Sequence, residues 1–126
     1  MIVVTGGDGF IGSNLIERLE KETSEKVLCV DYLNNRRSHH WCHPADFLSA
    51  KHYLEKTKVI FHNGACSDTT NDDPFYVLHK NFDYSVELLK RCMQHEIRLI
   101  YASSASVYGR GGFGFSESAR TFPLNL

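Results

Sequence analysis

The segment from Ile2 to Gly12, taken together with Asp31, constrains the fold of this sequence more than any other feature. It opens with I-V-V, a β-branched apolar run of the kind found in strands that are buried on both faces. The run passes directly into T-G-G-D-G-F-I-G, and from there apolar residues recur at helical spacing as far as Leu19. The sequence therefore predicts a strand, a glycine turn and a helix in direct succession.

Three of the four glycines of this segment, Gly6, Gly9 and Gly12, stand where the predicted helix begins. A helix N-terminus presents unpaired N–H groups and a partial positive charge, and glycines allow a pyrophosphate to approach that backbone. A second apolar run, V-L-C-V, ends on Asp31, about twenty residues past the glycines, where a dinucleotide-binding unit holds the adenosine ribose. Together these features predict a dinucleotide site, whereas glycines alone would indicate only a tight turn.

Length and composition bound the classes of protein to consider. A chain of 126 residues suits one domain, and its formal net charge of -1 offers no basic surface for nucleic acid. No cationic segment precedes the first apolar run, which is too short for a signal peptide or a membrane span. The four cysteines lack C-x-x-C spacing, which is typical of reduced thiols. We therefore expect a cytoplasmic protein that binds neither nucleic acid nor membranes.

The segment after Asp31 is a polar loop rich in side chains that can carry positive charge. Arg36 and Arg37 either pair with a 2′-phosphate, which would favour NADP over NAD, or remain solvated loop charges. The same loop contains possible metal ligands in H-H-W-C-H, but adjacent ligands rarely reach one tetrahedral centre without a second cluster. No metal site is predicted.

The rest of the chain alternates between predicted helices and strands. A short amphipathic helix is expected over Phe47–Glu55, and an apolar strand over Val59–Phe61 leads into H-N-G-A-C-S-D-T-T. Asp73 and Pro74 predict the start of a helix that runs to about His95, followed by a fourth strand, R-L-I-Y. The long helix is expected to pack on the sheet through Leu78, Phe82, Val86, Leu89 and Met93. This alternation predicts an α/β fold, a doubly wound parallel sheet of the Rossmann type.

Four segments carry a family likeness: T-G-G-D-G-F-I-G-S-N, H-N-G-A-C-S-D-T-T, K-N-F-D-Y-S-V-E-L-L and Y-A-S-S-A-S-V-Y-G. They resemble the extended short-chain dehydrogenase/reductase family over nearly the whole chain, least so from Tyr32 to Lys58. The first and last are shared by many sugar-nucleotide epimerases and dehydratases, and G-A-C-S-D-T-T is similar to the segment of an epimerase that makes the heptose precursor of lipopolysaccharide. The resemblance implies an NADP-dependent isomerase with a nucleotide-sugar substrate; NAD is the alternative cofactor.

The resemblance also implies roles for individual residues. Ser104 matches the family's catalytic serine, which hydrogen-bonds the substrate oxygen together with a tyrosine. Such enzymes oxidise a carbinol transiently, hold the reduced cofactor and return the hydride to the opposite face. Asn81 is expected to brace the crevice. The predicted cofactor-binding residues are Gly6, Gly9, Phe10, Ile11, Gly12, Asp31, Tyr32, Arg36, Arg37, Asn63, Gly64, Ala65, Cys66, Ser67 and Asn81.

In the family, a segment like P-L-N is followed by a Y-x-x-x-K motif and a substrate domain. We therefore expect residues 1–126 to form an NAD(P)-binding Rossmann-type domain that stops before this motif, lacks the C-terminal half of the sheet and is inactive alone. A full-length enzyme is expected to be a homo-oligomer. The alternatives are a non-catalytic NAD(P)-binding module and another NAD-dependent sugar-nucleotide epimerase or dehydratase.

Overall fold

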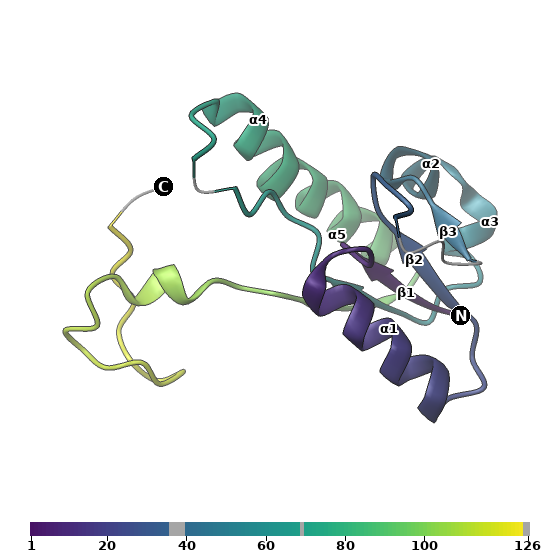
Figure 1. The fold of residues 1–126 in the computed structure, drawn as a ribbon, viewed down its shortest axis with the longest axis horizontal. Coiled ribbons are helices and arrows are strands. Elements are labelled where there is room, and N and C mark those ends of the chain that lie inside the picture. The colour runs from purple at the N-terminus through teal and green to yellow at the C-terminus, as the bar shows by residue number, and fades with distance from the viewer. Residues whose placement is uncertain (36–39, 69, 125–126) are drawn as a thin grey trace.

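A single parallel sheet organises the computed structural model, which describes residues 1–35, 40–68 and 70–124 (Figure 1). The strand order is β3-β2-β1-β4-β5, and every neighbouring pair is parallel. The strands are β1 (Ile2–Thr5), β2 (Val27–Val30), β3 (Trp41–Cys42), β4 (Val59–His62) and β5 (Arg98–Tyr101). The chain goes from β1 to β2 on one side and later returns to β4 on the other. This reversal creates the switch point at which doubly wound sheets bind ligands.

Four strands were predicted from their apolar runs, and all four are confirmed. The side chains of β1, β2 and β4 are mostly apolar because helices cover both faces of the sheet there. The strand β3 was not predicted, since its two residues lie in the segment interpreted as a polar loop. Backbone hydrogen bonds place it at the sheet edge: Cys29 N donates to the His40 carbonyl at 2.8 Å and Asp31 N to the Cys42 carbonyl at 3.2 Å.

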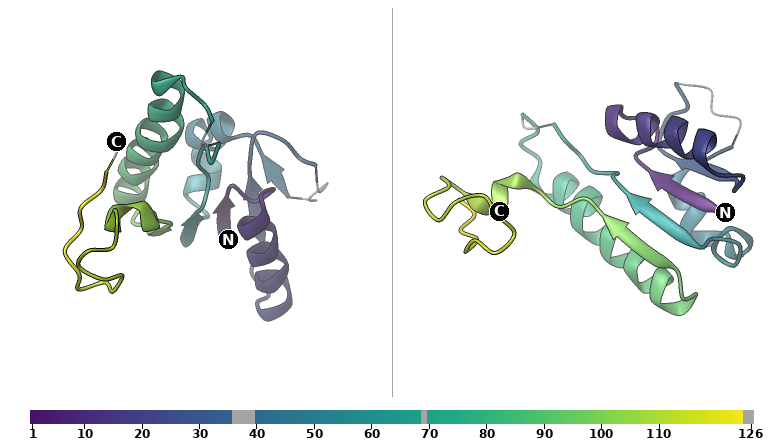
Figure 2. Two further views of the ribbon diagram at one scale, coloured as in Figure 1. Left: turned by 60° about the vertical axis from the view of Figure 1, so that its left-hand side comes forward. Right: turned by 90° about the horizontal axis from the view of Figure 1, so that it is seen from below.

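Helices lie on both faces of the sheet, with α1 (Phe10–Glu22) and α5 (Tyr84–Gln94) on opposite sides (Figure 2). Under α1 the core is formed by Val4, Ile16, Val27 and Cys29. On the other face, α5 packs with α2 (Pro44–Ser49) and α3 (Lys51–Leu54). That larger core contains Val3, Leu28, Val30, Cys42, Phe47, Leu54, Ile60, Leu88, Cys92 and Ile97. The prediction of a doubly wound α/β fold is confirmed.

Two helices replace the one predicted over Phe47–Glu55. The first begins with Pro44 at its first turn, where the missing N–H costs nothing, and the His43 ring accepts from Ala45 N at 3.3 Å. Helical geometry is interrupted at Ala50, whose ψ is 90°. The second helix then starts at Lys51, so the apolar side chains Phe47 and Leu54 both reach the core from a bent segment.

The long helix starts as predicted, because the Asp73 carboxylate accepts from the backbone N–H groups of Phe75 and Tyr76 at 3.0 and 3.1 Å. However, α4 (Pro74–Leu78) passes through a π-helix, η1 (His79–Asp83), before α5. A π-helical turn holds more residues than an α-helical turn, so it rotates the following positions around the helix axis. The predicted apolar stripe is therefore wrong. The buried residues are Leu88 and Cys92, while Leu78, Phe82, Leu89 and Met93 are exposed.

The chain leaves the sheet after β5 and curls back on itself (Figures 1 and 2). This segment contains one short 3₁₀ helix among the described residues, η2 (Ala105–Tyr108). Phe122 N donates to the Val107 carbonyl at 2.8 Å and so closes the loop. The strand β5 forms an edge of the sheet, and its side chains Ile100 and Tyr101 are exposed.

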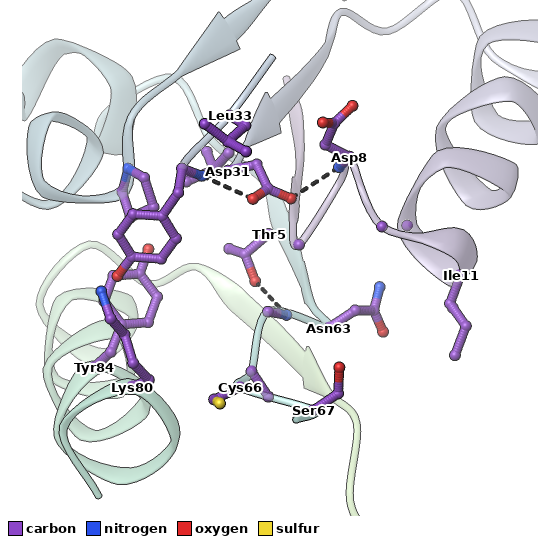
Figure 3. A pocket seen from close by; sticks show the side chains of 18 of the residues that line it. Thr5, Asp8, Ile11, Asp31, Leu33, Asn63, Cys66, Ser67, Lys80 and Tyr84 are labelled. Carbon is purple, nitrogen blue, oxygen red and sulfur yellow. Dashed lines mark hydrogen bonds between the residues drawn. The ribbon is translucent and has the colours of Figure 1, made fainter. Parts of the chain in front are cut away.

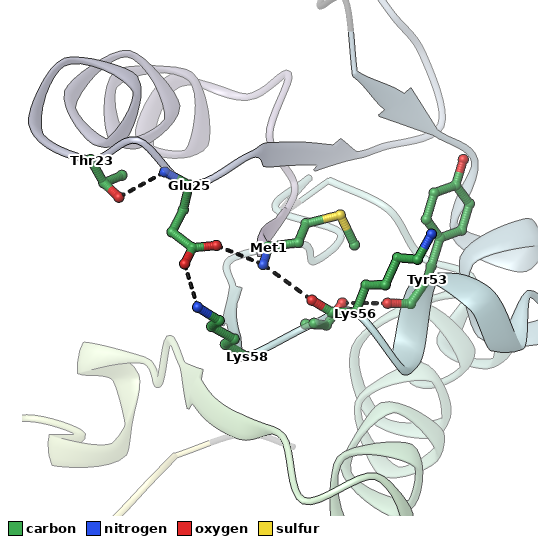
Figure 4. Close-up of polar contacts among 7 residues, drawn as sticks. Met1, Thr23, Glu25, Tyr53, Lys56 and Lys58 are labelled. Carbon is green, nitrogen blue, oxygen red and sulfur yellow. Dashed lines mark hydrogen bonds and ion pairs between the residues drawn. The ribbon is translucent and has the colours of Figure 1, made fainter.

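At the amino ends of the strands, Glu25 links the segments that precede β1, β2 and β4 (Figure 4). Its carboxylate accepts from the Met1 ammonium at 2.9 Å and from the Lys58 ammonium. The Met1 ammonium also donates to the Lys56 carbonyl at 3.1 Å. These hydrogen bonds, that of Lys58 first, lower the pKa of Glu25 to about 2.

Candidate functional site

The glycine turn borders a cavity of about 590 Å³ at the carboxyl ends of β1, β2 and β4 (Figure 3). A cavity of this size suits a small-molecule ligand. Phe10 and Ile11 lie at its rim with 82% and 66% of their surface exposed, which leaves apolar surface free for a ligand. The predicted cofactor residues that line it are Gly6, Gly9, Phe10, Ile11, Gly12, Asp31, Tyr32, Asn63, Gly64, Ala65, Cys66 and Ser67.

The glycines at positions 6, 9 and 12 of the turn serve different purposes. Gly6 has a φ of 66°, and a β-carbon on it would lie 2.7 Å from the Gly64 Cα. A β-carbon on Gly12 would lie 2.1 Å from the Gly6 carbonyl oxygen, so α1 can pack on the turn only without a side chain there. On Gly9, a β-carbon would meet only this same oxygen, at 3.3 Å, within 4 Å among the described residues. The fold thus requires glycine at positions 6 and 12, while Gly9 leaves room for a ligand.

The N-terminus of α1 is suited to an anion. Gly9 is its N-cap, no side chain caps it, and its first turn holds no acidic residue. The helix begins with Ser13 N donating to the Gly9 carbonyl at 3.0 Å. The preceding N–H groups and the positive end of the helix dipole therefore face no competing carboxylate from this turn, as a pyrophosphate site requires.

Asp31 links the end of β2 to the glycine turn. One carboxylate oxygen accepts from Asp8 N at 2.9 Å and the other from Tyr32 N at 2.7 Å (Figure 3). The Asp8 carboxylate in turn accepts from Asn35 N at 2.9 Å. Each carboxylate oxygen has a second lone pair, so Asp31 can still accept a hydrogen bond from a ribose hydroxyl.

Asn81 does not line the cavity but clamps the loop that does. Its amide oxygen accepts from Cys66 N at 2.6 Å, and its amide nitrogen donates to the Cys66 carbonyl at 3.2 Å. This pair of bonds satisfies a loop peptide that has no strand partner. Asn81 therefore braces the loop from Asn63 to Ser67 from the π-helix η1.

Hydrogen bonds through the buried His62 side chain connect the end of β1 and the loop after β4 with the long helix. Thr5 Oγ1 accepts from Gly64 N at 3.2 Å and lies 2.5 Å from His62 Nδ1, to which it donates when that nitrogen carries no proton. Ser85 Oγ donates to the Asn81 carbonyl at 2.7 Å and therefore accepts from His62 Nε2, at 2.8 Å. This network assigns the neutral Nε2–H tautomer. Burial lowers the pKa of His62, which favours the same neutral state.

Two buried polar atoms among the described residues have no hydrogen-bond partner, Asn63 Nδ2 and Tyr84 Oη, and both residues line the cavity. Buried polar groups are nearly always paired, so orphaned ones that line a cavity are expected where a ligand supplies the partner. The room beside Gly9 and these two unpaired groups fit a bound dinucleotide.

Sequence reasoning missed a row of side chains on the long helix. Tyr76, Lys80 and Tyr84 line the cavity at intervals of four residues, and the Lys80 ammonium lies 3.6 Å from the Tyr32 ring centroid. The spacing was visible in the sequence. However, the helical spacing of apolar residues assigned the packed stripe to Leu78, Phe82, Val86, Leu89 and Met93 and gave the face with Tyr76, Lys80 and Tyr84 no role.

Ser104 lies apart from the residues that line the cavity. It is exposed, its hydroxyl accepts from Ser106 N at 3.2 Å, and its Oγ lies 2.6 Å from Ser106 Oγ. It follows β5 at the same edge of the sheet as the glycine turn. Arg36 and Arg37 lie outside the described residues, so their predicted contact with a 2′-phosphate stays a prediction.

The described parts of the chain contain neither a metal-binding cluster nor a membrane-spanning helix. No group of three or more histidine, cysteine or acidic side chains is placed to hold a metal ion there. Across these residues no helix has the length and apolar character to cross a membrane. The thiols of Cys29, Cys42, Cys66 and Cys92 are all free. Burial raises the pKa of the Cys29 thiol to about 12, so this thiol next to the turn is not a nucleophile.

Comparison with known proteins identifies the family. The NAD dependent epimerase/dehydratase family matches residues 2–125. The chain belongs to this family. The glycine turn, the acid and the small-residue loop that meet at one edge of the parallel sheet fit the NAD dependence that the family's description states.

Individual relatives are longer than this chain. It is 40% identical to an ADP-L-glycero-D-manno-heptose-6-epimerase from Brachyspira hyodysenteriae. The match covers 100% of this chain and 44% of that enzyme. The crystal structure of the Helicobacter pylori enzyme of the same name is 29% identical with a TM-score of 0.79, over 98% of this chain and 45% of that one. MoeE5, solved in complex with UDP-glucose and NAD, is 27% identical with a TM-score of 0.75, over 98% of this chain and 43% of that one. The chain spans less than half the length of these relatives.

Proposed function

We propose that this chain is the cofactor-binding part of an epimerase that acts on an ADP-linked heptose, a precursor of lipopolysaccharide. The observation that carries the proposal is the open space at Gly9 within a turn whose other glycines are required by the fold. The 40% identity to an ADP-heptose epimerase supports the substrate class. The family supports a nicotinamide cofactor.

The residues of this chain would bind and orient the cofactor. The N-terminus of α1 receives the pyrophosphate, Asp31 accepts from the adenosine ribose, and the Asn81 clamp keeps the loop from Asn63 to Ser67 in place. When bound, the nicotinamide cofactor supplies hydride acceptance and return. Ser104 would donate a hydrogen bond to the substrate oxygen beside the strand end. In this role it orients the carbinol for proton transfer.

We propose NADP as the cofactor. The positions of Arg36 and Arg37 shortly after the ribose acid support a 2′-phosphate, because guanidinium groups bind phosphate bidentately. NAD is the alternative, and it is the cofactor named with the MoeE5 structure.

The cellular setting is part of the same proposal. We place the reaction in the cytoplasm, because all four thiols are free. We also propose that the whole enzyme is a homo-oligomer. The exposed apolar side chains along the long helix support this, since contiguous apolar surface marks interaction sites. They are Phe75, Leu78, Phe82, Leu89 and Met93.

A chimera tests the catalytic part of this proposal. The chain would replace the matching part of the Helicobacter pylori enzyme, which supplies the remainder of the protein. The purified chimera should epimerise the ADP-linked heptose, as followed by NMR of the sugar. Ser104→Ala should reduce kcat by about 10²–10⁴-fold, as expected for loss of acid–base assistance. Ser118→Ala, which removes a hydroxyl elsewhere in the terminal segment, serves as the matched control.

The outcomes separate two functions. A folded chimera that binds NAD(P) but has no turnover would favour a non-catalytic NAD(P)-binding module. Turnover that does not change in the Ser104→Ala variant would contradict the role given to this serine.

A further inference from the structure

We propose that Lys80 and Tyr84 form a phosphate-binding pair at the adenosine end of the crevice and select a cofactor that carries a 2′-phosphate. The inference rests on the proposed binding of a dinucleotide and names the residues that discriminate between its two forms. It is independent of Arg36 and Arg37, because it uses only residues that the structure describes.

Lys80 is a cation that has no counter-ion among the residues that the structure describes. It is half-buried, and its ammonium makes no salt bridge with any described residue. Instead it lies 3.6 Å from the ring centroid of Tyr32 and 5.4 Å from that of Tyr76. Aromatic faces attract a cation but do not neutralise it. Among the described residues that line the cavity, Lys80 is the only lysine or arginine.

Tyr84 supplies a second unsatisfied group one helical turn further on. Its hydroxyl oxygen is buried and has no hydrogen-bond partner in the described part of the chain. Burial raises the pKa of Tyr84, and the nearby Tyr32, Cys42 and Asp31 raise it further. The hydroxyl therefore keeps its proton and is a donor without an acceptor.

Both groups lie at the end of the cavity that receives the ribose. Figure 3 shows Lys80 and Tyr84 on one side of the pocket and Ile11 on the other, with Asp31 between them at the top. Ile11 belongs to the helix N-terminus, where the pyrophosphate is expected. Lys80 and Tyr84 are thus on the side of the adenosine, next to the residue that follows the ribose acid.

A phosphate on the ribose would supply a counter-ion for Lys80 and a hydrogen-bond acceptor for Tyr84. Its charge pairs with the Lys80 ammonium, and its oxygens accept from Tyr84 Oη. A free 2′-hydroxyl carries no charge and leaves Lys80 without a counter-ion. Asp31 is compatible with this arrangement: it can accept from the neighbouring ribose 3′-hydroxyl, and the N–H groups of Asp8 and Tyr32 that its oxygens accept offset part of its negative charge.

Two small probes isolate the adenosine end. Titration calorimetry with 5′-AMP and with adenosine 2′,5′-bisphosphate measures the preference for the second phosphate without involving the nicotinamide. The chain should bind the bisphosphate more tightly. Lys80→Met should weaken the binding of the bisphosphate by about tenfold or more, as for a lost charge-assisted hydrogen bond. The affinity for 5′-AMP should stay nearly unchanged. Lys80→Arg should keep the preference.

Controls separate a phosphate site from general charge and from folding. Lys90→Met removes the same charge from the same helix, outside the cavity, and should leave the preference intact. Tyr84→Phe should weaken the bisphosphate about 2- to 10-fold, the usual range for one neutral hydrogen bond. The same variant should not lower the thermal unfolding midpoint of the unliganded chain, because it removes an unpaired buried hydroxyl.

The failure of this inference differs from the failure of the proposed function. If the wild-type chain is folded by circular dichroism and binds neither probe, both are overturned. If it binds both probes and the Lys80→Met and Tyr84→Phe variants keep the wild-type preference, the phosphate-binding pair alone is overturned.

Discussion

His62 should make the stability of this protein fall as the pH drops below about 6.5, the pKa of an unfolded histidine. Its ring is 5% exposed and is held neutral between Thr5 and Ser85. Burial lowers its pKa in the folded state, so the unfolded chain binds a proton that the folded chain excludes. The stability contributed by neutral His62 is therefore fully present above pH 6.5 and is lost as the pH falls toward the folded pKa.

One proton sets the magnitude. A difference of one bound proton changes the free energy of unfolding by about 1.4 kcal/mol per pH unit. Between pH 7.5 and 5.5 the loss of stability attributable to His62 should reach up to about 1.4 kcal/mol. Nearly all of it falls below pH 6.5, because the unfolded histidine binds few protons above that pH. Protonation would also place a hydrogen on Nδ1, where the Thr5 hydroxyl now donates. The Thr5–Gly64 contact at the crevice should weaken at the same time.

Urea unfolding followed by circular dichroism measures this effect at both pH values. His62→Gln cannot titrate, so its loss of stability between pH 7.5 and 5.5 should be smaller than that of the wild type by up to the same 1.4 kcal/mol. His52→Gln, an exposed histidine on α3, is the matched control and should behave as the wild type. An equal fall in the wild type and in His62→Gln would refute the reasoning.

Two further predictions concern the fold. Gly12→Ala should lower the free energy of unfolding by ~3 kcal/mol, because its β-carbon would lie 2.1 Å from a backbone oxygen. Urea unfolding measures this loss, and a value below about 1 kcal/mol would show that α1 can shift. Glu25→Gln should reduce the dependence of stability on pH between about 4.5 and 2, since the lowered pKa of Glu25 gives stability that is present above 4.5 and lost on acidification. An unchanged acid unfolding curve would remove Glu25 from that role.

Most of the sheet and one wall of the site were predictable from the sequence. Apolar runs such as Val27–Val30 have no polar alternation, so they predict strands covered on both faces, as observed. The glycine turn and Asp31 could be placed because the sheet's switch point brings their strand ends together. Gly64 and Ala65 were placed for the same reason, whereas Asn63, Cys66 and Ser67 were assigned from the family resemblance.

The opposite wall could not be predicted because it depends on the π-helix. Helical spacing assigned Leu78 and Phe82 to the buried face, whereas the buried residues are Leu88 and Cys92, beyond the π-helical turn. Lys80 lies within that turn and lines the crevice. A two-residue edge strand such as β3 was equally hidden, because its pairing with β2 is a tertiary contact.

The central claim is that a dinucleotide binds against the backbone at Gly9. Calorimetric titration of NADP and NAD against the wild-type chain and the Gly9→Val variant tests it most directly. A side chain at Gly9 would occupy ligand space, and its β-carbon would meet only the Gly6 carbonyl oxygen among the described non-neighbouring atoms within 4 Å, so the variant should keep its circular dichroism spectrum and lose NAD(P) binding. Gly112→Val, at a glycine with no described atom near its β-carbon position, should bind as the wild type. Unchanged NAD(P) affinity in a folded Gly9→Val variant would contradict the account.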